Sequence, residues 1–202
     1  MRTFSKILTA LAFPSLLAAQ QPPPPPPAPA PATAPVVNPI TTAFKGRIGG
    51  LSRNIAQAFD SIPEAKFSYK PTPAQLSIGF IAQHVASDNY IFCDQFGEKK
   101  SSLPEKDTAT PDSVKATWPK DTLVAKLKAS FAFCQEALGQ LEDGKLADQI
   151  TLSFRGGNSR NVPRINMVLG HALDLADHYS QLANYMRLNG MLPPSALPRP
   201  RP

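Results

Sequence analysis

The stretch RINMVLGHALDLADHYSQLANYMRLNG, residues 164–190, decides the fold class of this chain. Its apolar side chains recur at spacings of three and four, which is the pattern of an amphipathic helix. Gly190 follows the last apolar residue and offers the left-handed backbone that ends many helices, and Pro193 prevents continuation. The sequence therefore predicts one long helix over residues 164–189.

Three polar side chains lie on the apolar stripe of this helix. His171, Asp174 and His178 are spaced i, i+3 and i+7, so they project from one face. Burying two imidazoles and a carboxylate is costly unless these groups pair with one another or bind a cation. The apolar members of the same stripe are Met167, Leu182 and Tyr185.

Residues 39–62, 73–97 and 122–143 show the same periodicity and are predicted to form three more helices. Residues 98–120 between them are polar and contain three prolines, which indicates a long crossover connection with a short helical turn around residues 111–116. No pair of strands is expected. Four long amphipathic helices predict an all-α protein, a four-helix bundle with a long crossover.

Two of these helices carry start signals. Asn38 precedes a proline at the first helical position and is expected to cap the first helix. Thr72, with Gln75 three residues later, is expected to form a capping box at the start of the second. The segment 146–154 has mixed character, and residues 155–158 are interpreted as a turn or loop.

The N-terminus has the three-part layout of a secretory signal. Arg2 and Lys6 precede an uncharged apolar stretch, and the small residues Ala18 and Ala19 follow it. This stretch is too short for a stable membrane span, so a permanent anchor is the weaker interpretation. We therefore expect an exported protein, periplasmic or extracellular.

Composition divides the chain into four parts. Residues 1–20 are predicted to be a signal peptide, and residues 21–38, rich in Pro and Ala, an extended linker. Residues 39–192 would form the helical domain, and residues 193–202 a disordered Pro-rich tail. Without the signal and tail residues the charge is nearly balanced and unclustered, so nucleic acid is not an expected partner.

The two cysteines, Cys93 and Cys134, are expected to form a disulfide, because an exported chain meets an oxidising compartment and no CxxC motif is present. Two buried thiols are the alternative. The protease motif HExxH, the esterase motif GxSxG and the phosphate-binding loop are also missing from the sequence.

His84 extends the group of candidate metal ligands to a second helix. It lies at helical spacing with Leu76, Phe80 and Ile91, so it could complete a three-ligand set with Asp174 and His178. From the residues alone, a hydrogen-bonded His-Asp cluster without metal is as well supported as a metal site.

Two segments, IAQHVASDNYIFC at residues 81–93 and LADHYSQLANYMRLNGMLPPS at residues 175–195, make the chain resemble the DinB superfamily, specifically its exported members. The resemblance implies a four-helix bundle that holds a divalent metal through three histidines. His84 and His178 match two of these ligands, whereas Asp174 stands where the family usually has the third histidine. His171 is then a substitute ligand or a partner of the ligands.

The resemblance implies a divalent metal, Zn, Ni, Mn or Fe, because carboxylates as well as imidazoles bind these ions. Some members of the superfamily are metal-dependent transferases or hydrolases, so a small-molecule substrate is expected. The alternative is a noncatalytic exported binding or interaction module in which the His-Asp cluster is structural. The sequence leaves the oligomeric state open, a homodimer included.

Overall fold

The computed structural model describes residues 36–153 and 157–198. The predicted signal peptide lies outside these ranges, as do residues 21–35 of the predicted linker and the last four residues of the predicted tail. None of the described helices is long and apolar enough to cross a membrane.

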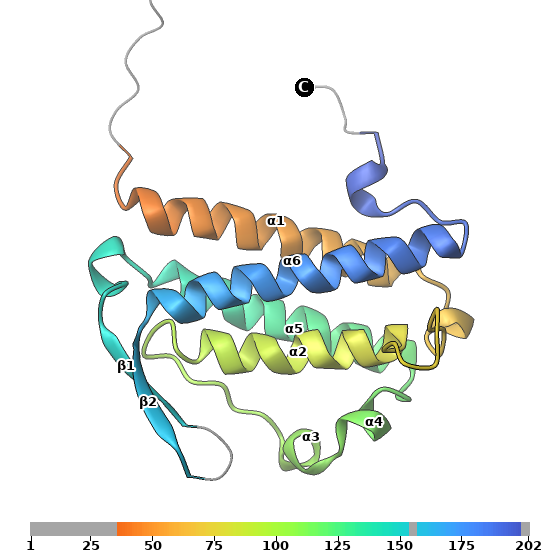
Figure 1. Ribbon diagram of the computed structural model, residues 1–202, viewed down its shortest axis with the longest axis horizontal. Coiled ribbons are helices and arrows are strands. Elements are labelled where there is room, and N and C mark those ends of the chain that lie inside the picture. Colours follow the sequence, from red (N-terminus) through yellow and green to blue (C-terminus); the bar gives the residue numbers. More distant parts are fainter. Residues whose placement is uncertain (1–35, 154–156, 199–202) are drawn as a thin grey trace, which may run out of the picture. The chain divides into compact units, whose positions relative to one another are not determined.

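Four long helices, α1 (Pro39–Ser61), α2 (Ile78–Cys93), α5 (Lys120–Gly139) and α6 (Ile165–Leu188), form the bundle. Figure 1 shows α1 and α6 running in one direction and α2 and α5 running in the opposite one. The connection from α2 to α5 returns along the bundle through the short helices α3 (Glu105–Ala109) and α4 (Asp112–Lys115). The predicted all-α bundle with a long crossover is confirmed, and α4 coincides with the predicted helical turn.

The core lies between the four long helices. Fully buried apolar side chains from each of them pack together, because each helix turns its apolar face inward. The largest of these side chains include Phe59, Ile81, Leu127 and Leu175.

The start of α2 differs from the prediction. Thr72 and Gln75 hydrogen-bond only to each other, at 3.1 Å between Oγ1 and Oε1, within a turn that precedes the helix. Ser77 is the actual cap, since its Oγ accepts a hydrogen bond from the Phe80 backbone N at 3.2 Å. The capping-box prediction was wrong because α2 begins at Ile78, and Ser77, the residue directly before it, caps its first turn.

The cap of α1 also comes from another part of the chain. Asn38 has a left-handed backbone with φ of 54° and makes no side-chain cap. Instead, the Asp143 carboxylate accepts hydrogen bonds from the backbone N of Ile40 at 3.0 Å and of Thr41 at 2.7 Å. Asn38 Oδ1 accepts a bond from the Asp143 N at 3.1 Å. The predicted capping role of Asn38 was therefore wrong.

A two-stranded antiparallel sheet, β1 (Gln149–Ser153) and β2 (Ser159–Pro163), corrects the expectation of no strand pair. Ile150 pairs with Val162, and Val162 is buried, so one face of this hairpin packs on the helices. The alternation is too short to be decisive in the sequence. Gly157, with φ of 81°, lies in the predicted turn, of which residues 155 and 156 are outside the described ranges.

The Pro-rich tail begins in a packed segment rather than as free chain. Pro193 is buried, and the 3-10 turn η3 (Pro194–Ala196) contacts α1. The backbone N of Ser195 donates to the Tyr179 hydroxyl at 2.9 Å. The folded region thus extends past residue 192, the boundary expected from composition.

Candidate metal centre

Four metal-ligating side chains meet where α2 and α6 pack together: His84, Asp88, Asp174 and His178. Each offers one ligand atom, and these atoms all lie within 4.8 Å of one another. His84 Nε2 is 3.2 Å from Asp88 Oδ2, and His178 Nε2 is 3.3 Å from Asp174 Oδ1. The structure therefore brings together the three residues predicted as ligands, and adds a fourth.

The order of residues on the two helices explains this meeting. His84 precedes Asp88 by four residues on α2, whereas Asp174 precedes His178 by four on α6. Because α2 and α6 run in opposite directions, the reversed order places imidazole beside imidazole. The His84 and His178 rings meet edge to face, with centroids 4.9 Å apart.

Sequence reasoning missed Asp88. On its own helix, a His-Asp pair four residues apart is an ordinary surface pattern. The signal that could have found it is the reversed spacing, HxxxD on one helix and DxxxH on the other, once the two helices are taken as antiparallel. His84 and Asp88 then lie in one four-residue cluster with Asp174 and His178.

The cluster is sealed on one side and open on the other. His178 is 6% exposed, whereas the His84 side chain is 32% exposed. Among the described residues, Asp174 Oδ2 and His178 Nδ1 are buried without a hydrogen-bond partner. An unpaired buried carboxylate oxygen is costly, and a bound cation would satisfy it, so the donor set fits a metal ion.

The electrostatics of the cluster favour added positive charge. Burial raises the pKa of Asp88, and the charge of Asp174 adds to that rise while His84 opposes it. Burial acts to lower the pKa of His178, but the hydrogen bond and charge of Asp174 outweigh it, and the net shift is upward. Both groups hold a proton more tightly than they would in water, so a metal ion would compete with protons here.

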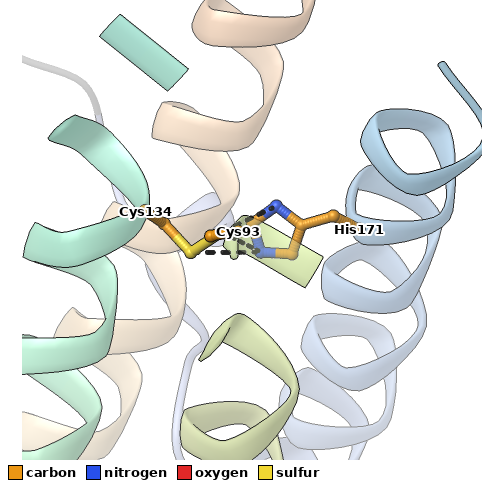
Figure 2. A group of neighbouring side chains, drawn as sticks. All are labelled: Cys93, Cys134 and His171. Carbon is orange, nitrogen blue, oxygen red and sulfur yellow. Dashed lines mark hydrogen bonds between the residues drawn. A yellow bond between two sulfur atoms is a disulfide. The ribbon is translucent and has the colours of Figure 1, made fainter. Parts of the chain in front are cut away.

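His171 lies in a different cluster, shown in Figure 2. Its ring is fully buried, and Cys93 and Cys134 project toward it from α2 and α5. The sulfur atoms lie 3.9–4.0 Å from the ring nitrogens. The structure thus groups His171 with the cysteines, apart from His84 and His178. Seven residues advance a helix by about 10 Å, which separates His171 from His178 along α6.

The polar side chains beside the disulfide are joined by hydrogen bonds within the protein. Cys93 and Cys134 are joined as a disulfide, as predicted, with Cα atoms 5.2 Å apart. Asn89 Nδ2 donates to Ser130 Oγ at 2.8 Å, which leaves its Oδ1 to accept from His171 Nε2 at 2.8 Å. Burial lowers the pKa of His171 to about 4, so this imidazole is neutral near pH 7.

An open groove at the start of α2 is lined by residues other than the four of the metal-ligand cluster. Phe80 lines it, and the Phe80 ring centroid is 5.9 Å from that of His84, one helical turn further along α2. The groove has a volume of about 740 Å³, and Leu76, Phe67 and Trp118 supply apolar walls. This size is within the range of small-molecule sites.

The sequence profile of the DinB superfamily matches residues 51–182, which span α1 to α6 and contain all four residues of the cluster. The chain belongs to the DinB superfamily. Among curated proteins, none matches it.

Solved structures share the fold of this DinB-superfamily chain. A DinB-like protein from Bacillus cereus aligns with a TM-score of 0.58 and 18% identity, over 77% of this chain and 97% of that one. A DinB-like protein from Bacillus subtilis gives 0.56 and 16%, over 78% and 96%. At such identities the likeness shows the fold alone.

A mycothiol-dependent maleylpyruvate isomerase is also similar in fold. It aligns with a TM-score of 0.55 and 15% identity, over 70% of this chain. The chain spans 60% of the isomerase's length. The bundle is therefore a scaffold shared with this isomerase, and the remaining part of the isomerase has no counterpart in the alignment.

Proposed function

We propose that this DinB-superfamily protein binds one divalent metal ion through His84, Asp174 and His178, and that it acts on a small molecule at that centre. The observation that carries the proposal is the convergence of these donors from α2 and α6 around a buried carboxylate oxygen without a partner. Two imidazoles and a carboxylate suit Zn²⁺, Ni²⁺, Mn²⁺ or Fe²⁺.

A bound ion would supply Lewis-acid polarisation of a thiolate, water or carbonyl group at its open positions. The chain's own residues would set the geometry. His178 is almost fully buried and is held by Asp174, so it is the fixed donor. His84 is on the exposed side, where a substrate could approach, and its ring centroid lies 5.9 Å from that of Phe80, which lines the groove.

The nature of the substrate is proposed from the fold neighbour. The isomerase depends on mycothiol, a thiol, and a transferase or hydrolase reaction on a thiol-containing small molecule is consistent with a Lewis-acid centre. Where such a molecule extends into the groove that Phe80 lines, the apolar walls there would exclude water from part of it.

The test is the metal content of the purified full chain beside three variants, His84→Ala, Asp174→Ala and His178→Ala. We expect near-stoichiometric metal in the wild type and its loss in each variant. His171→Gln is the matched control, because it replaces a histidine of the same helix that lies outside the cluster. A wild type that binds no added Zn²⁺, Ni²⁺, Mn²⁺ or Fe²⁺ more tightly than the triple variant would refute the proposal.

A noncatalytic binding or interaction module is the second candidate. The contacts of 3.2 and 3.3 Å pair each imidazole with a carboxylate of its own helix, which is also what a structural cluster would show. In that case removing His84 would lower the stability of the protein and leave its metal content unchanged.

Export is a further part of the proposal. Its supports are the charged, apolar and small-residue regions at the N-terminus and the disulfide, which persists in oxidising compartments. Mass spectrometry of the secreted or periplasmic protein should show loss of about the first 20 residues. Retention of Met1 would contradict processing.

A further inference from the structure

We propose that Asp88 supplies a fourth donor to the metal centre, which makes it a two-histidine, two-carboxylate site with increased preference for oxygen-seeking ions such as Mn²⁺. The inference rests on the proposed function, since it concerns the same centre. It goes further by adding a ligand and by naming the class of ion that this ligand would favour.

The distances within the cluster suit coordination. Four donors about 2.1 Å from an ion in a tetrahedral arrangement lie about 3.4 Å from one another. The two His-Asp contacts, 3.2 and 3.3 Å, are already near that value. The widest separation, at most 4.8 Å, would have to shorten by about 1.4 Å on ion binding.

Asp88 is placed differently from an ordinary surface carboxylate. Its side chain is 19% exposed, as is that of Asp174, and the charges of the two carboxylates act on each other. Asp88 pairs with His84 and Asp174 pairs with His178, and each imidazole carries charge only when it is protonated. A divalent cation between the helices would neutralise both carboxylates at once.

A second, independent observation points to a ligand. Asp174 Oδ2 is buried and has no partner among the described residues, and His178, nine-tenths buried, has an unpartnered Nδ1. Hydrogen bonds within the protein therefore do not satisfy every buried polar atom of the cluster. An ion held by Asp174 would lie within reach of Asp88, because their donor atoms are within 4.8 Å.

The second carboxylate changes which ions bind best. Imidazole nitrogens suit Zn²⁺ and Ni²⁺, whereas carboxylate oxygens suit Mn²⁺ and Mg²⁺. A fourth donor of the carboxylate type adds negative charge, and it should increase the affinity for Mn²⁺ more than the affinity for Zn²⁺. Asp88 would thus determine the metal preference.

The experiment titrates metal-free full-chain protein with Mn²⁺ and, separately, with Zn²⁺ in competition with a chromophoric chelator. Free Mn²⁺ is quantified by electron paramagnetic resonance. We expect Asp88→Asn to weaken Mn²⁺ binding by about tenfold or more and Zn²⁺ binding by a smaller factor. Co²⁺ bound to the variant should show stronger d–d absorption than in the wild type, because fewer ligands intensify these bands.

Asp177→Asn is the matched control. Asp177 is an exposed carboxylate on α6 that accepts a hydrogen bond from Gln181 Nε2 at 2.8 Å, four residues along the helix. Asp177 is not among the four clustered ligand residues, although its charge acts on His178, so Asp177→Asn measures the effect of lost charge alone and should weaken Mn²⁺ and Zn²⁺ binding by the same small factor, about twofold. Asp88→Glu, which keeps the carboxylate, should recover part of the Mn²⁺ affinity, and circular dichroism confirms that each variant is folded.

Three outcomes would overturn the inference. Unchanged Mn²⁺ affinity in Asp88→Asn would show that Asp88 is no ligand while leaving the three-ligand proposal intact. Equal weakening for Mn²⁺ and Zn²⁺, with an unchanged Co²⁺ spectrum, would show that Asp88 acts only through its charge. Equal affinity of the wild type and Asp174→Ala for both Mn²⁺ and Zn²⁺ would instead refute the proposed function, and the inference with it.

Discussion

Two histidines on the same helix, seven residues apart, have opposite environments. His171 is fully buried against the disulfide, and burial lowers its pKa to about 4. His178 is also buried, yet its hydrogen bond to Asp174 and the nearby negative charge offset burial and raise its pKa. The difference shows that burial alone does not set the charge of a core histidine; its partners decide.

The two clusters also differ in how their polar atoms are bonded. Around His171, the amide of Asn89, the hydroxyl of Ser130 and the Leu127 carbonyl form a chain of hydrogen bonds within the protein. Around His178, two buried polar atoms of the cluster have no partner among the described residues. We infer that the first cluster holds the bundle together and that the second is built to receive a ligand.

Breaking the disulfide should have the largest effect on stability. It closes a loop with a sequence separation of 41, which the chain-entropy account values at about 4 kcal/mol. The double variant Cys93→Ser, Cys134→Ser should lose about that much free energy of unfolding in urea denaturation and still bind metal. No free thiols should react in the denatured, unreduced wild type; two reactive thiols would contradict the disulfide.

The second-largest effect is expected from acid, which should destabilise the folded protein through the buried His171. Between pH 6.5 and 4 the unfolded chain binds a proton that the folded protein excludes, so stability falls as pH falls through this range. The decrease in the free energy of unfolding that is due to His171 should reach about 3 kcal/mol. It is measured as the difference between wild type and His171→Gln in urea denaturation at pH 7, 6, 5 and 4. Parallel pH profiles for the two proteins would contradict it.

Protons should compete with metal at the other cluster. Because the folded pKa of His178 is raised, its protonated form persists to higher pH than in a free histidine, and metal binding requires the neutral ring. We expect Zn²⁺ affinity to weaken by up to about tenfold per pH unit below that pKa. Calorimetric titration at pH 8, 7 and 6 measures it, and a pH-independent affinity would exclude His178 as a ligand.

A change remote from both clusters should have the smallest effect. Asp143→Ala removes the carboxylate that caps the backbone of Ile40 and Thr41 at the start of α1. We expect the melting temperature to fall by about 4 °C, with unchanged metal content. An unchanged melting temperature would mean that solvent caps this helix end equally well.

The sequence by itself determined the four long helices, because apolar periodicity and stop signals such as Gly190 are local properties. It also placed His84, Asp174 and His178 on helices that could meet. It did not determine the cap of α1, since Asp143 reaches Ile40 from about 100 residues away. Nor did it indicate the hairpin, whose strands are too short for a clear alternation.

The separation of the histidines was decided only by tertiary structure. Helical spacing places His171 and His178 on one face, but it cannot say which neighbouring helix covers each turn of that face. The packing of α2 in the opposite direction to α6 sets Asn89 and Cys93 beside His171, and His84 and Asp88 beside His178. Side chains far apart in sequence thus complete each cluster, and only the packed bundle brings them within bonding distance.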